Sequence, residues 1–412
     1  MRTTLVAAAA TLLTATTGLA PPAVAAEKLP YSDQCEFPNG QYPGRPWSLQ
    51  RVLLDELWSR STGEGVRVAV VDTGVDVTNP QLRDAVDAKA GINVLPKNLK
   101  DENGDPIERG KENGTSDAVG HGTKVAGIIA ARPATGTGFV GLAPDATIIP
   151  IQQNDAEGHG DTGTLATAIR HAIEAKAGVI NISQDTSDAA KPDPDLERAI
   201  NEAIDRDIVV VASAGNDGVG GNVKRTYPAS YAGVLAVAAS DRNNERASFS
   251  QSGDFVDVAA PGVDMISTVP KGGHCSDSGT SFAAPYVAGV VALVRSKHPD
   301  WTAQQIVAQI EQTAERTIAG HDRLVGWGVV DPVRALTEDD HPIESPRPRE
   351  GLTRAEAPTP AKFQLGETPD ERNARLATYV AVAAAVLAAG LGGTAVAIRD
   401  ARRRARRVVG AE

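Results

Sequence analysis

The sequence has 412 residues, of which 41% are hydrophobic, and its formal net charge is −11. The hydrophobic fraction is too high for an intrinsically disordered chain, and the length allows one large domain with further segments. The acidic balance argues against nucleic-acid binding, which needs a basic surface, so no nucleic-acid partner is expected. The 2 cysteines exclude a disulfide-dense scaffold and a zinc site with four thiolates.

The N-terminus has the organisation of a secretory signal peptide. Arg2 supplies an early positive charge, an apolar run follows at 5–20, and an A-x-A step stands at 23–25. The alternative, an N-terminal membrane anchor, is less consistent with so short and Thr-containing a segment. We therefore predict a signal peptide over 1–25 and export of the remaining chain.

Residues 26–60 are expected to form an N-terminal extension. Much of this segment, from 29 to 50, is polar and rich in Pro and Tyr. Such a composition gives little apolar surface to bury in a separate core. We predict that the extension wraps around the domain that follows it.

Short β-branched segments alternate with helix-like segments in the next part of the chain. The predicted strands are 66–71, 147–151, 179–182, 208–211 and 234–238, and the predicted helices are 121–131, 162–177 and 194–206. Apolar strands that alternate with helices indicate a parallel sheet covered by helices on both faces. We therefore predict an α/β domain over 61–336, with its reactive groups at the carboxyl ends of the strands.

Three motifs place reactive side chains at the ends of these elements. Asp72 follows the first strand, His121 begins a helix, and Ser281 begins an apolar helix. In this combination Ser281 would attack a carbonyl carbon, His121 would transfer the proton, and Asp72 would orient the imidazole. The backbone N–H of Ser281 and the side-chain amide of Asn216 would stabilise the oxyanion.

The same chain allows a remote alternative, the chemistry of an aspartic protease. The motifs that begin at Asp72 and Asp277 both fit the pattern D-[ST]-G, in which two carboxylates share a proton and activate water. The second motif, however, follows a Gly-rich segment and leads into a helix. Aspartic proteases are also mostly β, whereas this pattern alternates, so the serine mechanism is favoured.

The cysteines are expected to pair with each other. Cys35 lies in the N-terminal extension, and Cys275 lies shortly before Ser281. Two cysteines in an exported chain most simply form one disulfide. We predict a Cys35–Cys275 bridge, and the alternative is a pair of free or intermolecular thiols.

The C-terminal part has three segments of different composition. Residues 337–375 are polar and Pro-rich, which is typical of an extended linker. Residues 376–398 carry no charged side chain and are long enough to span a bilayer. The tail, 399–412, carries an Arg cluster that favours the cytoplasmic side. We predict a single-pass cell-membrane protein with an extracytoplasmic catalytic domain, and the alternative is a soluble Ala-rich helix with a basic tail.

The order of the motifs resembles that of the subtilisin-like serine proteases, the subtilases of peptidase family S8. D-T-G at 72–74, H-G-T at 121–123, a loop Asn at 216 and G-T-S-x-A-x-P at 279–285 occur in the family's order. The resemblance implies a three-layer subtilisin-like fold, a triad of Asp72, His121 and Ser281, and an oxyanion hole of Asn216 and Ser281.

The resemblance also implies a substrate-binding role for Ser183, Gln184 and Gly215. Secreted subtilisins typically have a small apolar residue where this chain has Gln184. This departure favours a narrower or more polar specificity pocket, and hence the processing of a few protein substrates.

The whole architecture resembles that of the mycosins, which are membrane-anchored subtilases of type VII (ESX) secretion. The resemblance implies cleavage of secreted client proteins and association with the type VII secretion membrane complex. The alternative is a structural subunit of that complex with secondary protease activity. No cofactor and no metal are expected.

Overall fold

The computed structural model describes residues 35–100, 104, 106, 109–155, 160–183, 192–221, 225–349 and 366–409. The signal peptide predicted over 1–25 and the predicted substrate-binding residue Gln184 lie outside the described residues. The chain divides into two compact units, Met1–Gly351 and Leu352–Glu412. The first holds the predicted catalytic domain, and the second holds the predicted membrane span.

The first unit is built on a 7-stranded sheet with the order β2-β3-β1-β4-β5-β6-β7. All neighbouring strands in it run parallel. Its strands are β1 (Arg67–Asp72), β2 (Ile92–Asn93), β3 (Thr147–Gln152), β4 (Val179–Ile182), β5 (Val209–Ser213), β6 (Val234–Ser240) and β7 (Val258–Pro261). A separate antiparallel pair consists of β8 (Met265–Thr268) and β9 (His274–Asp277).

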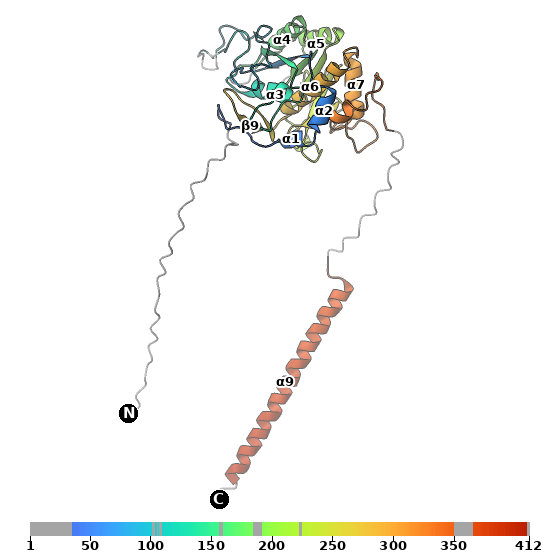
Figure 1. Cartoon of the computed structure of the whole chain (residues 1–412). Coiled ribbons are helices and arrows are strands. Elements are labelled where there is room, and N and C mark those ends of the chain that lie inside the picture. Colours follow the sequence, from blue (N-terminus) through green and yellow to red (C-terminus); the bar gives the residue numbers. More distant parts are fainter. Residues whose placement is uncertain are drawn as a thin grey trace, which may run out of the picture. The chain divides into compact units, whose positions relative to one another are not determined.

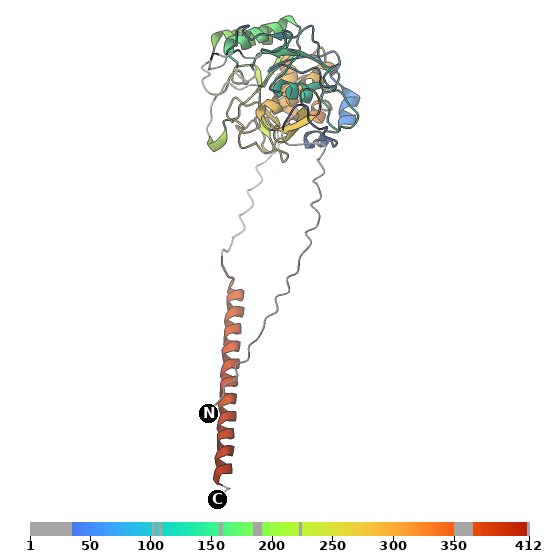
Figure 2. The same ribbon diagram turned by 90° about the vertical axis from the view of Figure 1, so that its left-hand side faces the viewer.

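Helices cover both faces of the large sheet. On one face α3 (His121–Ala130) and α6 (Thr280–Lys297) share a core with Val68 and Val70 of β1. On the other face α4 (Thr162–Glu174) and α5 (Pro194–Asp205) pack against Ala69 and Val71. Successive side chains of a strand point to opposite faces, so β1 is apolar throughout because both of its faces are buried. Figure 1 and Figure 2 show these helix layers on either side of the strands, which confirms the predicted three-layer α/β fold.

Further helices complete the first unit. They are α1 (Trp47–Gln50), α2 (Leu54–Arg60), a 3-10 turn at Val219–Gly221, α7 (Ala303–Thr313) and α8 (Pro332–Ala335). The helix α7 begins with a capping box, in which Thr302 and Gln305 satisfy each other's backbone N–H groups.

The N-terminal extension lies against the domain through covalent and polar contacts. A disulfide joins Cys35 to Cys275 of β9, with the two Cα atoms 5.4 Å apart. Close to it, the N–H of His274 donates to the carbonyl of Gly40 at 3.0 Å. The extension thus adds backbone hydrogen bonds beside the strand that leads toward Ser281.

The buried, neutral imidazole of His274 holds the extension through hydrogen bonds. The N–H of Tyr42 donates to its Nδ1 at 3.1 Å, so its Nε2 carries the proton and donates to Gln81 Oε1 at 2.7 Å. Burial lowers the pKa of His274 to about 4, which keeps the ring neutral at pH 7 and its Nδ1 able to accept.

The first part of the predicted linker packs on the catalytic domain. Asp339 forms an ion pair with Lys297 and lies 2.6 Å from His298 Nε2 at the end of α6. Farther along, the N–H of Arg349 donates to the carbonyl of Ala319 at 2.8 Å. Contacts with the domain therefore continue through residue 349, beyond the predicted domain end at 336.

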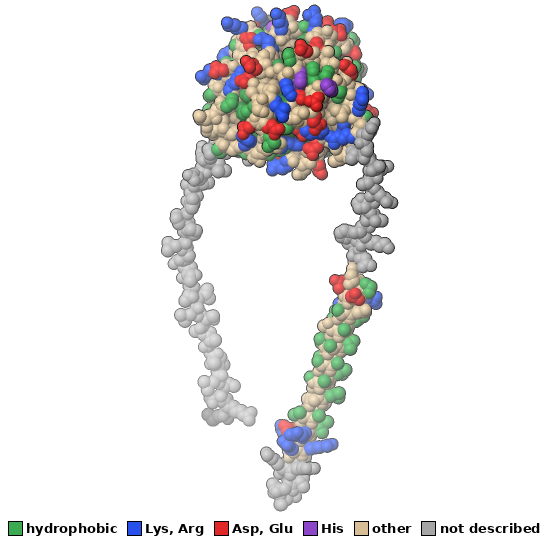
Figure 3. All heavy atoms as spheres, turned by 45° about the vertical axis from the view of Figure 1, so that its right-hand side comes forward, with side chains coloured by type: hydrophobic (Ala, Val, Ile, Leu, Met, Phe, Trp, Pro, Cys, Tyr) green, Lys and Arg blue, Asp and Glu red, His purple; other side chains and the backbone are tan. Residues whose placement is uncertain are grey.

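The second unit contains the helix α9 (Pro369–Val409). Its part Pro369–Arg404 is the only helix among the described residues that is long and apolar enough to cross a membrane, with a mean hydropathy of 2.1 over its best window. Figure 3 shows hydrophobic side chains along this helix and positively charged side chains, which are all Arg, near its C-terminal end. The segment agrees with the span predicted at 376–398.

A thiol titration tests the disulfide. We expect no free thiol in the unreduced, denatured protein and 2 thiols after reduction. We also expect Cys275→Ser to lower the free energy of unfolding by about 3–5 kcal/mol, because the bridge closes a long loop in the unfolded chain. Finding two reactive thiols before reduction would contradict the bridge.

Candidate active site

Three of the predicted site residues lie at one edge of the large sheet. Asp72 ends β1, Ser183 directly follows β4, and Gly215 lies two residues beyond β5. These three strands are neighbours and run parallel, so their carboxyl ends meet at the same edge. Ser183 is buried there and accepts a hydrogen bond from Asn181 Nδ2 at 2.7 Å.

The central contact of the site joins Asp72 to His121. Asp72 Oδ1 lies 2.7 Å from His121 Nδ1, and the N–H of Thr73 donates to the same oxygen at 2.8 Å. Asp72 is completely buried, whereas 27% of the His121 side chain is exposed. The carboxylate therefore fixes the buried edge of the imidazole, and Nε2 lies on the opposite edge of the ring.

A glycine lets the N-terminus of α3 approach β1 closely enough for this contact. A Cβ atom at Gly122 would stand 2.2 Å from the carbonyl oxygen of Gly74 and 3.0 Å from Asp72 Cβ. Any larger residue at 122 would push the helix away from the strand. The H-G-T motif thus requires its glycine for close packing, as well as its histidine for chemistry.

Asp117 and Thr73, which the sequence analysis did not single out, hold the first turn of α3. Asp117 Oδ2 accepts hydrogen bonds from the N–H of Thr123 at 2.8 Å and from its Oγ1 at 2.6 Å. Thr73 Oγ1 donates to Asp117 Oδ1 and accepts from the N–H of Gly122, both at 2.9 Å. These bonds satisfy N–H groups that a helix start otherwise leaves unpaired. In the sequence, the role of Asp117 was indicated only by its position, four residues before His121.

The charges around His121 set its proton affinity. Burial lowers the pKa of His121, but the charge and hydrogen bond of Asp72 raise it, and so does the charge of Asp117. Lys124 opposes them, and the net result is a pKa raised above the ordinary value of 6.5. Burial also raises the pKa of Asp117, against the effect of its hydrogen bonds.

Ser281 lies in the first turn of α6, and 8% of it is exposed. The next residue, Phe282, places its ring 5.2 Å from the imidazole of His121, measured between ring centroids. The starts of α3 and α6 are therefore side by side, although their sequences are far apart. This packing places the helix start that bears the predicted nucleophile next to the predicted base.

Asn216 is oriented by the start of α6. The N–H of Thr280 donates to Asn216 Oδ1 at 2.9 Å, so the Nδ2 end of the amide faces away from that N–H. Thr280 Oγ1 in turn accepts from the N–H of Gly215 at 3.2 Å. Thr280 was not singled out from the sequence, where its only signal was its place in G-T-S.

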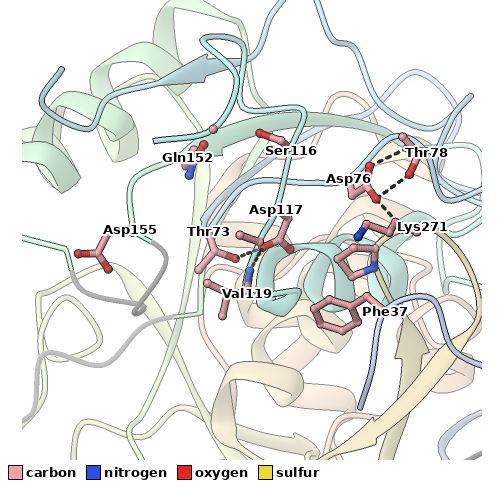
Figure 4. Close-up of a pocket in the computed structure, with 13 residues that line it drawn as sticks. Phe37, Thr73, Asp76, Thr78, Ser116, Asp117, Val119, Gln152, Asp155 and Lys271 are labelled. Atoms are coloured by element: carbon pink, nitrogen blue, oxygen red, sulfur yellow. Dashed lines mark hydrogen bonds between the residues drawn. The ribbon is translucent and has the colours of Figure 1, made fainter. Parts of the chain in front are cut away.

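A cavity of about 420 Å³ is lined in part by Thr73 and Asp117, the two residues that hold the first turn of α3. Figure 4 shows Thr73, Asp117 and Val119 among the residues that line it, together with Phe37 of the N-terminal extension. Val119 stands two residues before His121 and Thr73 directly follows Asp72, so the cavity adjoins the Asp72–His121 pair. Its other charged lining residues are Asp76, Asp155 and Lys271.

In the part of the chain that the structure describes, no cluster of three or more His, Cys, Asp or Glu side chains is arranged to hold a metal ion. A buried carboxylate, an imidazole and a hydroxyl at a helix start are the groups that acyl transfer through a serine requires.

The sequence profile of the subtilase family matches residues 63–328. The chain belongs to the subtilase family. It is 40% identical to M-protease of Shouchella clausii over 286 residues, which is 69% of this chain and 68% of that protein. It is 35% identical to subtilisin E of Bacillus subtilis over 287 residues, which is 69% of both.

Among solved structures, this subtilase resembles mycosins. It matches MycP3 protease from the type VII (ESX-3) secretion system with a TM-score of 0.63 and 34% identity, over 73% of this chain and 90% of that one. It matches MycP1 from Mycobacterium smegmatis with a TM-score of 0.61 and 30% identity, over 81% of this chain and 91% of that one. The subtilase is thus a serine endopeptidase, as the motifs predicted.

The aspartic-protease alternative is wrong for this subtilase. Asp72 contacts His121, and Asp277 contacts a different residue, with Asp277 Oδ2 2.8 Å from Lys124 Nζ. Each carboxylate therefore has its own positively charged or protonatable partner. At Asp277 the D-[ST]-G pattern consists of the last residue of β9 and the two residues after it, the second of which begins the G-T-S motif.

The raised pKa of His121 predicts the pH dependence of acylation. The predicted base must be neutral to accept a proton, so the rate should rise with pH through a midpoint above 6.5. The measurement is the rate of covalent labelling by a fluorophosphonate between pH 5 and 9. A rate that stays flat between pH 5 and 8 would contradict the role of His121.

Proposed function

We propose that this subtilase is a membrane-anchored, extracytoplasmic endopeptidase that processes secreted client proteins through an Asp72–His121–Ser281 triad. The observation that carries the proposal is the 2.7 Å contact between Asp72 Oδ1 and His121 Nδ1, beside the helix start that bears Ser281. The proposed anchor is α9, and the proposed context is type VII secretion.

In the proposed reaction Ser281 Oγ attacks the scissile carbonyl carbon while His121 Nε2 takes the hydroxyl proton. Asp72 holds the ring in the tautomer with its proton on Nδ1 and stabilises the imidazolium that forms. His121 then gives the proton to the leaving amine, and an ester links Ser281 to the acyl part of the substrate. Water, deprotonated by His121, hydrolyses that ester and restores the serine.

The negative charge on the carbonyl oxygen is proposed to lie between the N–H of Ser281 and Nδ2 of Asn216. The bond from Thr280 to Asn216 Oδ1 supports this role, because it fixes the amide before substrate arrives. Donors that are fixed in advance need no reorganisation as charge develops, which is how an oxyanion hole lowers the barrier. Ser183 and Gly215, at the ends of neighbouring strands, are proposed to contact the peptide, together with Gln184.

Localisation is proposed from the ends of the chain. A signal peptide over 1–25 would export the domain, and the span at 376–398 would retain it at the cell membrane. The Arg cluster after the span supports a cytoplasmic C-terminus. The linker over 337–375 would begin as the segment through residue 349 that packs on the domain and continue as the tether to the span.

The type VII role is supported by similarity to MycP3 and MycP1, which are described as proteins of such secretion systems. The similarity extends over most of the catalytic domain and well beyond the four motifs. The proposed partners are therefore secreted client proteins and a secretion complex in the same membrane.

Replacing the proposed nucleophile tests the chemistry. We expect a fluorophosphonate to label the full-length protein, and Ser281→Ala to abolish labelling because the reacting hydroxyl is gone. The neighbouring hydroxyl variant Ser278→Ala serves as the matched control and should retain labelling. Labelling that persists in Ser281→Ala would contradict the proposed nucleophile.

The secretion role is tested by comparing secreted proteins from cells with the wild-type gene, Ser281→Ala or a gene deletion. Client proteins that appear uncleaved in Ser281→Ala support processing. Secretion that is lost only on deletion supports the alternative, a structural subunit with secondary protease activity. Identical secreted proteins in all three would contradict both roles.

A further inference from the structure

An ion pair close to the proposed triad has no part in the reaction described above. Lys124 Nζ lies 2.8 Å from Asp277 Oδ2. Lys124 belongs to α3, three residues after His121, and Asp277 ends β9, four residues before Ser281. The pair therefore connects the helix that carries the proposed base to the segment that leads into the proposed nucleophile.

The two members of the pair differ in exposure. Only 8% of the Lys124 side chain is exposed, whereas 41% of the Asp277 side chain is exposed. A nearly buried ammonium is costly unless a partner offsets its charge. Asp277 supplies that partner from the edge of the site, and its other oxygen, Oδ1, accepts the N–H of Ser278 at 2.8 Å. The carboxylate thus holds both the cation and the turn that precedes Gly279.

Further contacts tie Lys124 to the same region. Its Nζ lies 5.9 Å from the ring centroid of Phe282, the residue that also faces His121. Its carbonyl accepts a hydrogen bond from Ser267 Oγ of β8 at 2.6 Å. One lysine therefore touches α6, β8 and β9 from within α3, at the junction where the two proposed catalytic helices meet.

We propose that the Lys124–Asp277 ion pair is a positioning device for the active site. It fixes the start of α3 against the start of α6 and partly offsets the negative charge around His121. Lys124 and His121 are three residues apart and so share one face of the helix. This inference rests on the proposed function, because it concerns the geometry between His121 and Ser281.

The electrostatic part of the proposal follows from the groups that face His121. Asp72 from β1 and Asp117 from the loop before α3 both raise the pKa of His121, and Lys124 lowers it. The ring of Phe282 from α6 carries no charge. Lys124 is therefore the cation that limits how strongly the two carboxylates hold a proton on the imidazole, and Asp277 partly offsets that cation.

The proposal predicts that substitutions of Lys124 and of Asp277 shift the pH midpoint of labelling in opposite directions. The measured quantity is the rate of fluorophosphonate labelling of the full-length protein as a function of pH. Lys124→Met removes the cation, so the midpoint should move to higher pH. Asp277→Asn leaves the cation unopposed, so the midpoint should move to lower pH. The plateau rate should fall about 10-fold or more in Lys124→Met, because the two helix starts lose their link.

Two further variants separate positioning from general stability. Lys124→Arg keeps the cation and should keep the wild-type midpoint. Asp195→Asn breaks an ion pair with Arg170 between α4 and α5, on the other face of the sheet, and should change neither the midpoint nor the plateau. Asp277 is partly exposed, so Asp277→Asn should fold even where Lys124→Met is poorly stable.

The outcomes distinguish this proposal from the proposed function. A wild-type protein that the fluorophosphonate does not label would overturn the proposed function itself. A labelled wild type whose midpoint stays fixed in both Lys124→Met and Asp277→Asn, or moves in the same direction in both, would overturn the positioning device alone. Opposite shifts, with the midpoint kept in Lys124→Arg, would support it.

Discussion

The site depends on one buried carboxylate. Asp72 is completely buried at the end of β1, and its Oδ2 has no hydrogen-bond partner among the described residues. A buried charge of this kind is costly unless something offsets it. The contact of Oδ1 with His121 Nδ1, assisted by the N–H of Thr73, supplies that compensation. The same contact orients the imidazole, so stability and chemistry both depend on it.

The rest of the domain holds His121 at that carboxylate. The parallel sheet brings β1 and the ends of β4 and β5 to one edge, and Gly122 lets α3 approach that edge. Asp117 and Thr73 fix the first turn of α3, while Phe282 brings α6 against the imidazole. The N-terminal extension, through its disulfide to β9, is attached to the strand that leads toward Ser281.

Local patterns were sufficient to predict the α/β architecture and the residues of the candidate triad. The apolar strand pattern and the D-T-G, H-G-T and G-T-S motifs are properties of short segments. In the fold, these segments form the strand and the helix starts that were predicted from them. The supporting contacts could not be predicted in this way. Lys124 and Asp277 are separated by 153 positions, and no local pattern says that α3 packs beside β9. Asp117, Thr280 and the buried His274 likewise acquire their roles from neighbours that only the fold supplies, and Gln184 lies outside the described residues.

The most direct measurement of the central claim uses Asp72→Asn. An asparagine keeps the shape of the side chain but removes the charge that compensates an imidazolium and holds the reactive tautomer. We expect the fluorophosphonate labelling rate at neutral pH to fall by about 10³–10⁴-fold. A labelling rate within about tenfold of wild type would contradict the central role of the Asp72–His121 contact.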